Sequence, residues 1–208
     1  MSRTAVLNKT QIIQSAFEIA REKGRSAVTL RELGKRLGKS TAAIYTQYPS
    51  IDAIILDLIS YINKLVYVSC MEKRTKDKFL NSGIGFLAFV MKNKMIFGDF
   101  LLSADEQKNN SKQDTSFYVN LMKQSPITSV LDDDRVLNIL ENMQIYTYGL
   151  ATMICSDINP DNDLNFYINK LEQAGKSLIG YHMYSSGKYE LALKRLVDKF
   201  DVDKKEYI

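Results

Sequence analysis

The sequence predicts an all-α protein, and three observations carry that prediction. No stretch shows the strict alternation of apolar and polar residues that is typical of a half-buried strand. The three prolines, Pro49, Pro126 and Pro160, each mark a break, and long helical patterns fill the intervals between them. The chain of 208 residues is 45% hydrophobic, which is enough to bury a core.

The first predicted helix begins at Asn8, where the order Asn-Lys-Thr-Gln forms a capping box with Gln11. It ends near Lys23 and Gly24. Its apolar residues form one stripe at helical spacing: Ile12, Ile13, Ala16, Phe17 and Ala20. We expect this stripe to cover the two helices that follow.

Residues 29–48 predict two short helices joined by a turn, which is a helix-turn-helix. Thr29 and Glu32 form a second capping-box pattern at the start of the first helix. Gly38 suits a left-handed C-terminal cap, and Ser40 suits the N-terminal cap of the next helix. The apolar residues of the first helix recur at helical spacing: Leu30, Leu33 and Leu37.

The second of these helices has two contrasting faces. Ile44 and Tyr48 share the face that we expect to point inward. The opposite face is small or hydroxyl-bearing and suits entry into a major groove: Thr41, Ala42, Tyr45 and Thr46. Pro49 then ends the helix, and Ser50 begins a long apolar helical pattern.

The charge of the chain is concentrated in the same region. Residues 1–48 hold nine Lys and Arg against three acidic residues, a net charge of +6. The whole chain carries +4, so the remainder carries −2. Such a patch attracts a polyanion through counterion release, although a solvated helical surface with a chance cationic excess gives the same count.

Residues 10–58 resemble the DNA-binding domain of the TetR family of transcriptional repressors. The resemblance rests on Phe17 and Gly24, the segment 29–33, Leu37-Gly38, Ala43-Ile44-Tyr45, and Tyr48 with Ser50 and Asp52. Later parts resemble the family in length, in helicity and in a weaker segment at 148–151. The resemblance implies a DNA-binding unit over residues 1–50 and a helical ligand-binding and dimerisation domain over residues 51–208.

The resemblance also implies which residues meet DNA. Thr41, Ala42 and Tyr45 occupy positions that touch bases, and Arg31 occupies one that reaches a base or a phosphate. Gln47 stands where the family often has histidine, and Ile51 where it often has a phosphate-binding lysine. Lys39 and Arg25 are expected to compensate for that lysine, as is the N-terminal tail that carries Arg3. The predicted DNA-binding set is Thr29, Arg31, Lys39, Ser40, Thr41, Ala42, Tyr45, Thr46, Gln47 and Tyr48.

Past the DNA-binding unit, helical patterns cover most of the chain. We expect helices near residues 51–72, 76–93, 95–103, 114–124, 131–156, 162–185 and 188–200. Aromatic and methionine side chains gather in the middle of this region, where the family encloses a small-molecule pocket. The predicted ligand-binding set is Phe86, Phe89, Phe100, Tyr118, Met122, Tyr146 and Tyr148. Core packing is the alternative for each of them, and Gly83, Gly85 and Gly98 indicate close packing, a kink or ligand space.

The helix at 162–185 carries a stripe of apolar and small residues that permits close helix approach: Leu164, Ile168, Leu171, Gly175 and Leu178. Ordinary core packing within one subunit explains such a stripe. The resemblance favours a dimer interface, because the family pairs two late helices of each subunit in a four-helix bundle. A homodimer then presents two helix-turn-helix units to a palindromic operator.

Enzymatic and metal-binding functions find little support. His182 is the only histidine, and no glycine-rich phosphate loop precedes a helix. The acidic run 132–134 is explained by favourable charge at a helix N-terminus. Cys70 and Cys155 lack metal-ligand spacing, so we expect free thiols, no disulfide and no cofactor. We find no apolar run of membrane-spanning length and no signal peptide, and expect a cytosolic protein.

The sequence therefore predicts a homodimeric transcriptional regulator, a repressor that a small apolar ligand releases from double-stranded DNA. The alternative is an architectural or protein-partnered DNA-binding factor without a ligand. A buried, solvent-connected cavity between residues 84 and 153 separates the two, because only the first needs one.

Overall fold

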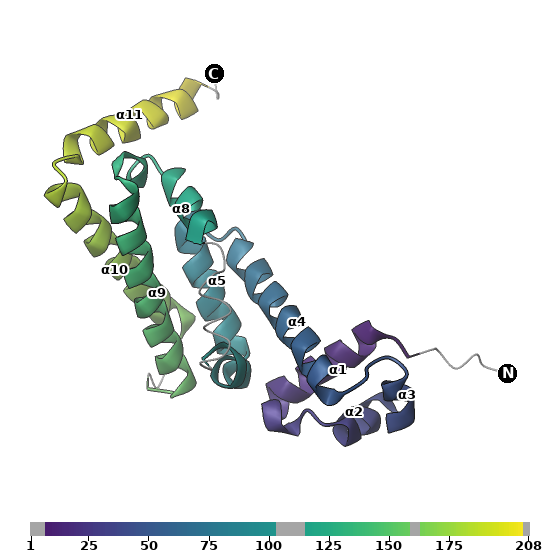
Figure 1. Cartoon of the computed structure of the whole chain (residues 1–208). Helices are drawn as coiled ribbons and strands as arrows, with labels where there is room; N and C mark the ends of the chain where they lie inside the picture. The colour runs from purple at the N-terminus through teal and green to yellow at the C-terminus, as the bar shows by residue number, and fades with distance from the viewer. Residues whose placement is uncertain (1–6, 103–114, 159–162, 206–208) are drawn as a thin grey trace.

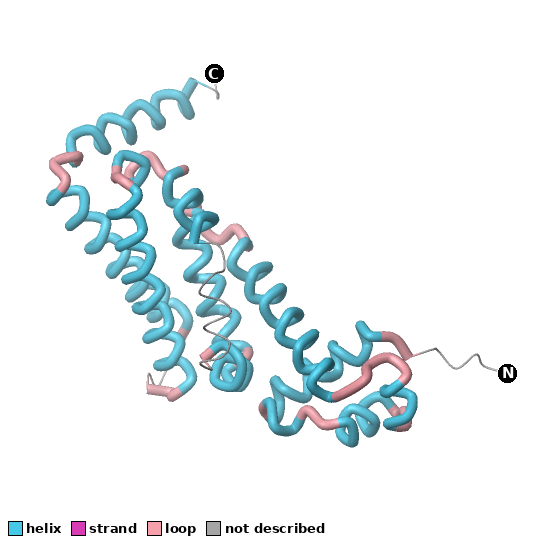
Figure 2. Tube along the Cα trace, in the orientation of Figure 1, coloured by secondary structure: helices cyan, strands magenta, loops and turns pink. Residues whose placement is uncertain are grey.

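The computed structural model describes residues 7–102, 115–158 and 163–205, with side chains described as far as Val197. All regular structure in these residues is helical, as Figure 2 shows, so the predicted all-α class is confirmed. Figure 1 shows two parts, a small N-terminal group of helices and a larger bundle, with the long helix α4 running between them.

The N-terminal part contains α1 (Lys9–Lys23), a 3-10 turn η1 (Arg25–Ala27), α2 (Leu30–Leu37) and α3 (Thr41–Tyr45). The capping box at Asn8 is complete, with the side chain of Asn8 accepting from the Gln11 amide at 2.9 Å. Only half of the box predicted at Thr29 forms. The Thr29 hydroxyl accepts from the Glu32 amide at 3.2 Å, whereas the Glu32 carboxylate pairs with Lys23. Gly38 adopts the left-handed conformation that the turn requires, with φ of 62°.

Helix α4 (Ile51–Met71) contributes to both parts of the molecule. Its first half packs against α1, where the rings of Phe17 and Tyr61 meet edge to face at 5.6 Å. Its second half packs against α5. The boundary that we predicted after residue 50 therefore falls at the start of a helix that the two units share.

By length and composition, α4 is also apolar enough to cross a membrane, with a mean hydropathy of 1.5. This finding corrects the expectation that no apolar segment reaches that length. The core helix of a soluble protein passes the same test, so the finding is weak evidence for a membrane.

The larger part contains α5 (Lys78–Lys92), α6 (Lys94–Ile96), a π-helical turn η2 (Phe97–Leu101), α8 (Thr115–Lys123), a 3-10 turn η3 (Thr128–Val130), α9 (Asp133–Cys155), α10 (Leu164–Ser185) and α11 (Tyr189–Lys205). These bounds agree with the predicted helices to within a few residues, except that the helix expected at 95–103 is a short helix followed by the π-turn. In Figure 1, α5, α8, α9 and α10 form the body of the bundle, and α11 crosses its far end.

Three glycines that the sequence left ambiguous have different roles. A Cβ atom on Gly85 would lie 2.1 Å from the carbonyl oxygen of Ser69, so Gly85 permits the close approach of α5 to α4. A Cβ atom on Gly83 would lie 2.7 Å from Leu171, which places α10 against α5. Gly98 has nothing within 4 Å and lies in the π-turn.

Polar residues that resembled functional groups have structural contacts. The Asp132 carboxylate accepts from the Arg135 amide at 3.0 Å and caps α9, as predicted for the acidic run. His182 is buried, and its Nε2 atom lies 3.0 Å from the side-chain oxygen of Asn138, which joins α10 to α9. Cys70 and Cys155 are free thiols, as expected.

Candidate DNA-binding surface and ligand cavity

The short helix α3 is held by contacts on its inner side. Ile44 is fully buried in the core, and Tyr48 is buried just after the helix. The Tyr48 hydroxyl donates to a carboxylate oxygen of Asp57 on α4 at 2.7 Å. Burial raises the pKa of Tyr48 well above its ordinary value, and the Asp57 contact adds to the shift. A Cβ atom on Gly34 would lie 2.8 Å from the Lys39 carbonyl oxygen, so α2 and the turn fit closely.

The opposite side of α3 faces solvent. Thr41, Ala42 and Thr46 are exposed, and the Tyr45 side chain is 52% exposed. The Thr46 hydroxyl donates to the carbonyl oxygen of Ala43 at 2.7 Å, which leaves its oxygen as an acceptor. The structure therefore brings the predicted base-contacting residues together on one accessible face.

The remaining predicted DNA-binding residues lie around this face with different exposures. Arg31 and the cap residues Thr29 and Ser40 are exposed, whereas Gln47 and Lys39 are half-buried. Tyr48 is buried, unlike the other residues of the predicted set, and its hydroxyl donates to Asp57. This contact positions the end of α3 against α4, and a direct DNA contact of Tyr48 stays an untested prediction.

Ion pairs divide the cations of the N-terminal unit into two groups. Arg36 pairs with Glu22 through two hydrogen bonds of 2.9 Å, and Lys23 pairs with Glu32. The hydrogen bond from Arg36 lowers the pKa of Glu22, and the hydrogen bond from Lys23 lowers that of Glu32. Within the described part of the chain, the cations without a carboxylate partner include Lys9, Arg31, Lys35 and Lys39. The unpaired charge thus includes the predicted DNA-binding cations.

Lys9 is a candidate that the sequence did not single out. Its ammonium group lies 4.8 Å from the centroid of the Tyr48 ring, so it is held just beyond the end of α3, the predicted recognition helix. The position of Lys9 at the start of α1 does not predict this proximity, because the contact depends on how the helices of the N-terminal unit pack together.

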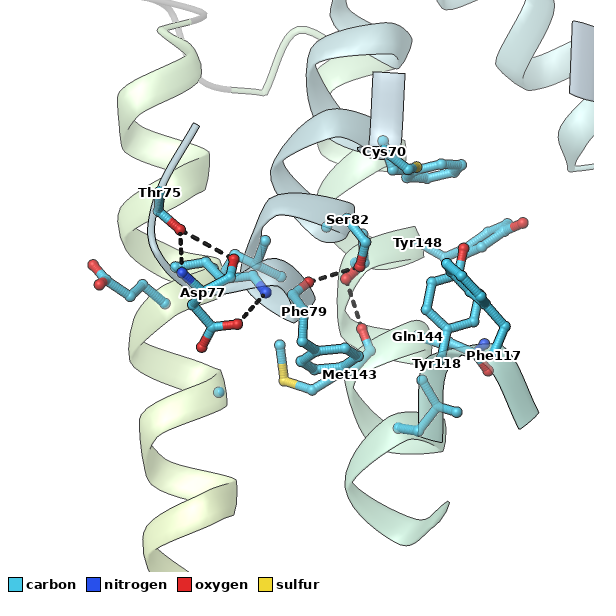
Figure 3. A pocket seen from close by; sticks show the side chains of 18 of the residues that line it. Cys70, Thr75, Asp77, Phe79, Ser82, Phe117, Tyr118, Met143, Gln144 and Tyr148 are labelled. Atoms are coloured by element: carbon cyan, nitrogen blue, oxygen red, sulfur yellow. Dashed lines mark hydrogen bonds between the residues drawn. The ribbon is translucent and has the colours of Figure 1, made fainter. Parts of the chain in front are cut away.

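A cavity of about 630 Å³ lies among α4, α5, α8, α9 and α10. Figure 3 shows Phe79, Phe117, Tyr118 and Tyr148 among the side chains that line it. Of the predicted ligand-binding residues, Phe86, Tyr118 and Tyr148 line the cavity. Phe89, Phe100 and Met122 are buried in the core outside it, and Tyr146 lies on the exposed side of α9.

Several lining residues come from helices that the sequence did not connect with a pocket. Tyr67 and Cys70 lie near the end of α4, and Leu171 and Gly175 lie on α10. No local signal identifies them, because each follows an ordinary helical pattern. The cavity exists only where these distant helices meet.

The cavity wall is largely apolar, with a few polar groups. Burial raises the pKa of the Cys70 thiol to about 12 and also raises the pKa of the Tyr148 hydroxyl. Both groups are therefore uncharged near neutral pH. Asn63, Gln144 and Lys76 are among the polar residues that line the cavity. The arrangement suits an apolar molecule that carries a small number of polar atoms.

The predicted dimer-interface stripe packs inside its own chain. Leu171 is 2% exposed and lies against Gly83, and Gly175 lies against Met143 of α9. Leu164, Ile168 and Leu178 also pack against the core of the same chain. Leu171 is therefore covered by its own chain, whereas Leu164, Ile168 and Leu178 are half-buried, and their place in a dimer interface stays a prediction. Helical periodicity identifies an apolar face but not the neighbour that covers it.

The fold and the exposed recognition helix define a helix-turn-helix DNA-binding regulator. Residues 12–58 match the family described as bacterial regulatory proteins, tetR family. The N-terminal DNA-binding unit of the chain is therefore similar to that of the TetR family. No curated protein sequence matches it.

Two solved structures match the chain. A TetR protein from Acinetobacter baumannii AYE has a TM-score of 0.52 and 15% identity, and the match covers 89% of this chain and 98% of that chain. The Streptomyces coelicolor TetR family protein ActR, solved in complex with (S)-DNPA, has a TM-score of 0.48 and 13% identity, with 94% and 100% covered. The first similarity supports the all-α two-domain fold.

Proposed function

We propose that this regulator is a homodimeric repressor, which a small apolar ligand releases from a palindromic operator in bacterial cytoplasm. The observation that carries the ligand is the cavity of about 630 Å³, because an architectural DNA-binding factor has no use for one. Its volume lies within the range of pockets that hold drug-sized molecules.

Ligand binding is tested with 1-anilinonaphthalene-8-sulfonate, an aromatic probe whose fluorescence rises in apolar surroundings. We expect saturable binding, and we expect Gly175→Leu to abolish it. A Cβ atom on Gly175 meets only Met143, at 3.6 Å, so the leucine side chain has room to extend into the cavity. Asn169→Leu, on an exposed position of the same helix, is the control. Equal probe binding by all three proteins would place the ligand elsewhere.

The dimer interface that we propose lies on the side of α9 and α10 that does not line the cavity. Ile145 on α9 is 73% exposed, and Tyr181 and Tyr184 on α10 are 65% and 85% exposed. A monomer gains nothing by exposing large apolar side chains on two adjacent helices, whereas pairing two copies buries them. Phe166 on α10 and Tyr146 on α9 are also exposed.

The dimer is tested by placing a charge on this surface. Ile145→Glu buries a carboxylate in each subunit of the proposed dimer and should drive it toward monomers at micromolar concentration. Leu56→Glu on α4 is the control, since Leu56 is 66% exposed and lies outside the surface. Light scattering after size exclusion reads the mass. A dimeric Ile145→Glu protein would exclude this interface.

Repression is tested on the promoter that flanks the coding region, where regulators of this kind commonly act. We propose that the predicted DNA-binding residues form the contact surface, except that Tyr48 is left out of the set and Lys9 is added to it. Footprinting should protect two half-sites on one face of the duplex, about one helical turn apart. A continuous footprint without two-fold symmetry, or binding that ignores sequence, would instead favour an architectural factor.

A further inference from the structure

The π-helical turn η2 touches the wall of the ligand cavity. Leu101 of this turn lines the cavity directly. Phe97, at the start of the turn, packs against the rings of Phe86 at 6.1 Å and Tyr148 at 5.8 Å, which are themselves lining residues. A molecule that moves either ring therefore moves Phe97.

The same turn also holds the DNA-binding unit. The Asp99 carboxylate accepts a hydrogen bond of 2.7 Å from the backbone amide of Arg25, in the turn between α1 and α2. The Arg25 guanidinium group lies 5.3 Å from the centroid of the Phe100 ring. Two successive residues of η2 thus contact one residue of the DNA-binding unit.

The fit at this junction depends on Gly24. Its φ is +83°, and a Cβ atom there would lie 2.7 Å from the Asp99 oxygen and 3.0 Å from Met95. Glycine provides both the backbone conformation and the space. Because no free space separates Asp99 from Gly24, a small displacement of Asp99 changes the contact between them.

The backbone of η2 is suited to a discrete change. The amide of Leu102 donates to the Phe97 carbonyl oxygen at 2.9 Å, a bond five residues back along the chain. Such turns hold one residue more than an α-helical turn and occur frequently at functional sites. A change of one residue in register turns the following side chains by about 100°. That rotation would take Asp99 away from the Arg25 amide.

We propose that η2 is the element through which the occupied cavity acts on the DNA-binding unit, and that the Asp99 to Arg25 hydrogen bond is the contact it controls. This inference rests on the proposed function and assigns the regulation of the same cavity. A ligand that displaces Tyr148 or Phe86 moves Phe97, η2 changes, and the turn that follows α1 loses its support. Helix α4 offers a competing route, because it lines the cavity and enters the DNA-binding unit without involving Asp99.

A double-mutant cycle without ligand separates the two routes. The variants are Tyr148→Ala, Asp99→Ala and the combination, and the two readouts are hydrogen exchange at the Arg25 amide and the operator Kd. We expect Tyr148→Ala to change both by about fivefold or more when Asp99 is present, and to change neither further in the Asp99→Ala background. Tyr146→Ala, exposed on the same helix and outside the cavity, should leave hydrogen exchange at the Arg25 amide unchanged.

If the effects of Tyr148→Ala and Asp99→Ala on hydrogen exchange and on the operator Kd add independently, the inference is overturned in favour of the α4 route. It is also overturned if Tyr148→Ala changes neither readout. Circular dichroism checks the fold of each variant, and Phe97→Leu replaces Tyr148→Ala if that protein does not fold. Because the cycle contains no ligand, its outcome is separate from that of the proposed function. A cavity that binds no probe would refute the ligand and leave the measured coupling as it stands.

Discussion

The Tyr48 hydroxyl donates to the Asp57 carboxylate at 2.7 Å, and this hydrogen bond joins the end of the recognition helix to α4. Helix α3 has five residues, too few to be stable alone, so its direction depends on such contacts. The hydrogen bond therefore helps to place the exposed face of α3.

Tyr48→Phe should lower the free energy of unfolding by about 1 kcal/mol, since it removes one hydrogen bond whose acceptor is partly solvated. Operator binding should weaken as well, because α3 is less well held. Urea unfolding and a gel-shift titration measure the two effects. Tyr45→Phe is the control for stability, since it removes a hydroxyl at an exposed position; an equal loss there would show that the Asp57 bond has no special effect.

Tyr45→Ala should weaken specific operator binding by about 1–3 kcal/mol while leaving the fold unchanged, because its half-exposed side chain projects from the recognition helix. Binding to unrelated DNA should change much less. Competition between operator and unrelated duplex measures the ratio. A well-folded variant with an unaltered ratio would remove Tyr45 from the proposed base contacts.

Arg31→Ala should reduce the slope of log K against log salt by about one if Arg31 neutralises a phosphate, and should instead relax sequence preference if it reads a base. Arg36→Ala provides a matched comparison, since Arg36 is already paired with Glu22. We expect a smaller change in slope for Arg36→Ala. Fluorescence anisotropy over a salt series gives both slopes, and a larger change at Arg36 would reverse the assignment of free and paired cations.

Gly85→Ala should strongly destabilise the fold, since a Cβ atom there would lie 2.1 Å from the Ser69 carbonyl oxygen and force α4 and α5 apart. Overpacking of this kind costs about 1–3 kcal/mol or more. Gly98→Ala meets no atom within 4 Å and serves as the control. Thermal unfolding compares the two. Similar melting temperatures would mean that the helices separate at little cost.

Cys70 should react slowly with iodoacetamide in the folded protein. Burial raises its thiol pKa to about 12, and a raised thiol pKa lowers the fraction of reactive thiolate at every pH below that value. The rate should therefore rise with pH well into the alkaline range and should reach the ordinary thiol rate on unfolding. Mass spectrometry resolves Cys70 from the half-buried Cys155, which should react faster. Rapid alkylation of Cys70 near neutrality would contradict this.

The parts of the fold that depend on local chemistry were predictable from the sequence. Asn8, Ser40 and Gly38 marked helix ends correctly because caps and left-handed turns are set by a few adjacent residues. Leu171 shows the limit. Its periodicity gave the correct buried face, but the neighbour that covers that face, Gly83, is contributed by a distant helix.

The cavity and the π-turn show the same limit in another form. Phe86 and Tyr148 could be predicted as lining residues from aromatic content, whereas Tyr67 could not, because the end of α4 reaches the cavity only in the assembled bundle. The π-turn at 97–101 carries no sequence mark that distinguishes it from an α-helix.

The backbone contact between Gly85 and Ser69 has a mechanical consequence. Two helices that approach with no room for one methyl group slide or hinge poorly against each other, so α4 and α5 behave as a single stiff strut. In the proposed dimer, two such struts would carry the recognition helices at their ends. The half-site spacing that the protein accepts would then be set by the angle between the struts, and a change in that angle of a few degrees would be enlarged along their length into a mismatch with the DNA helical repeat.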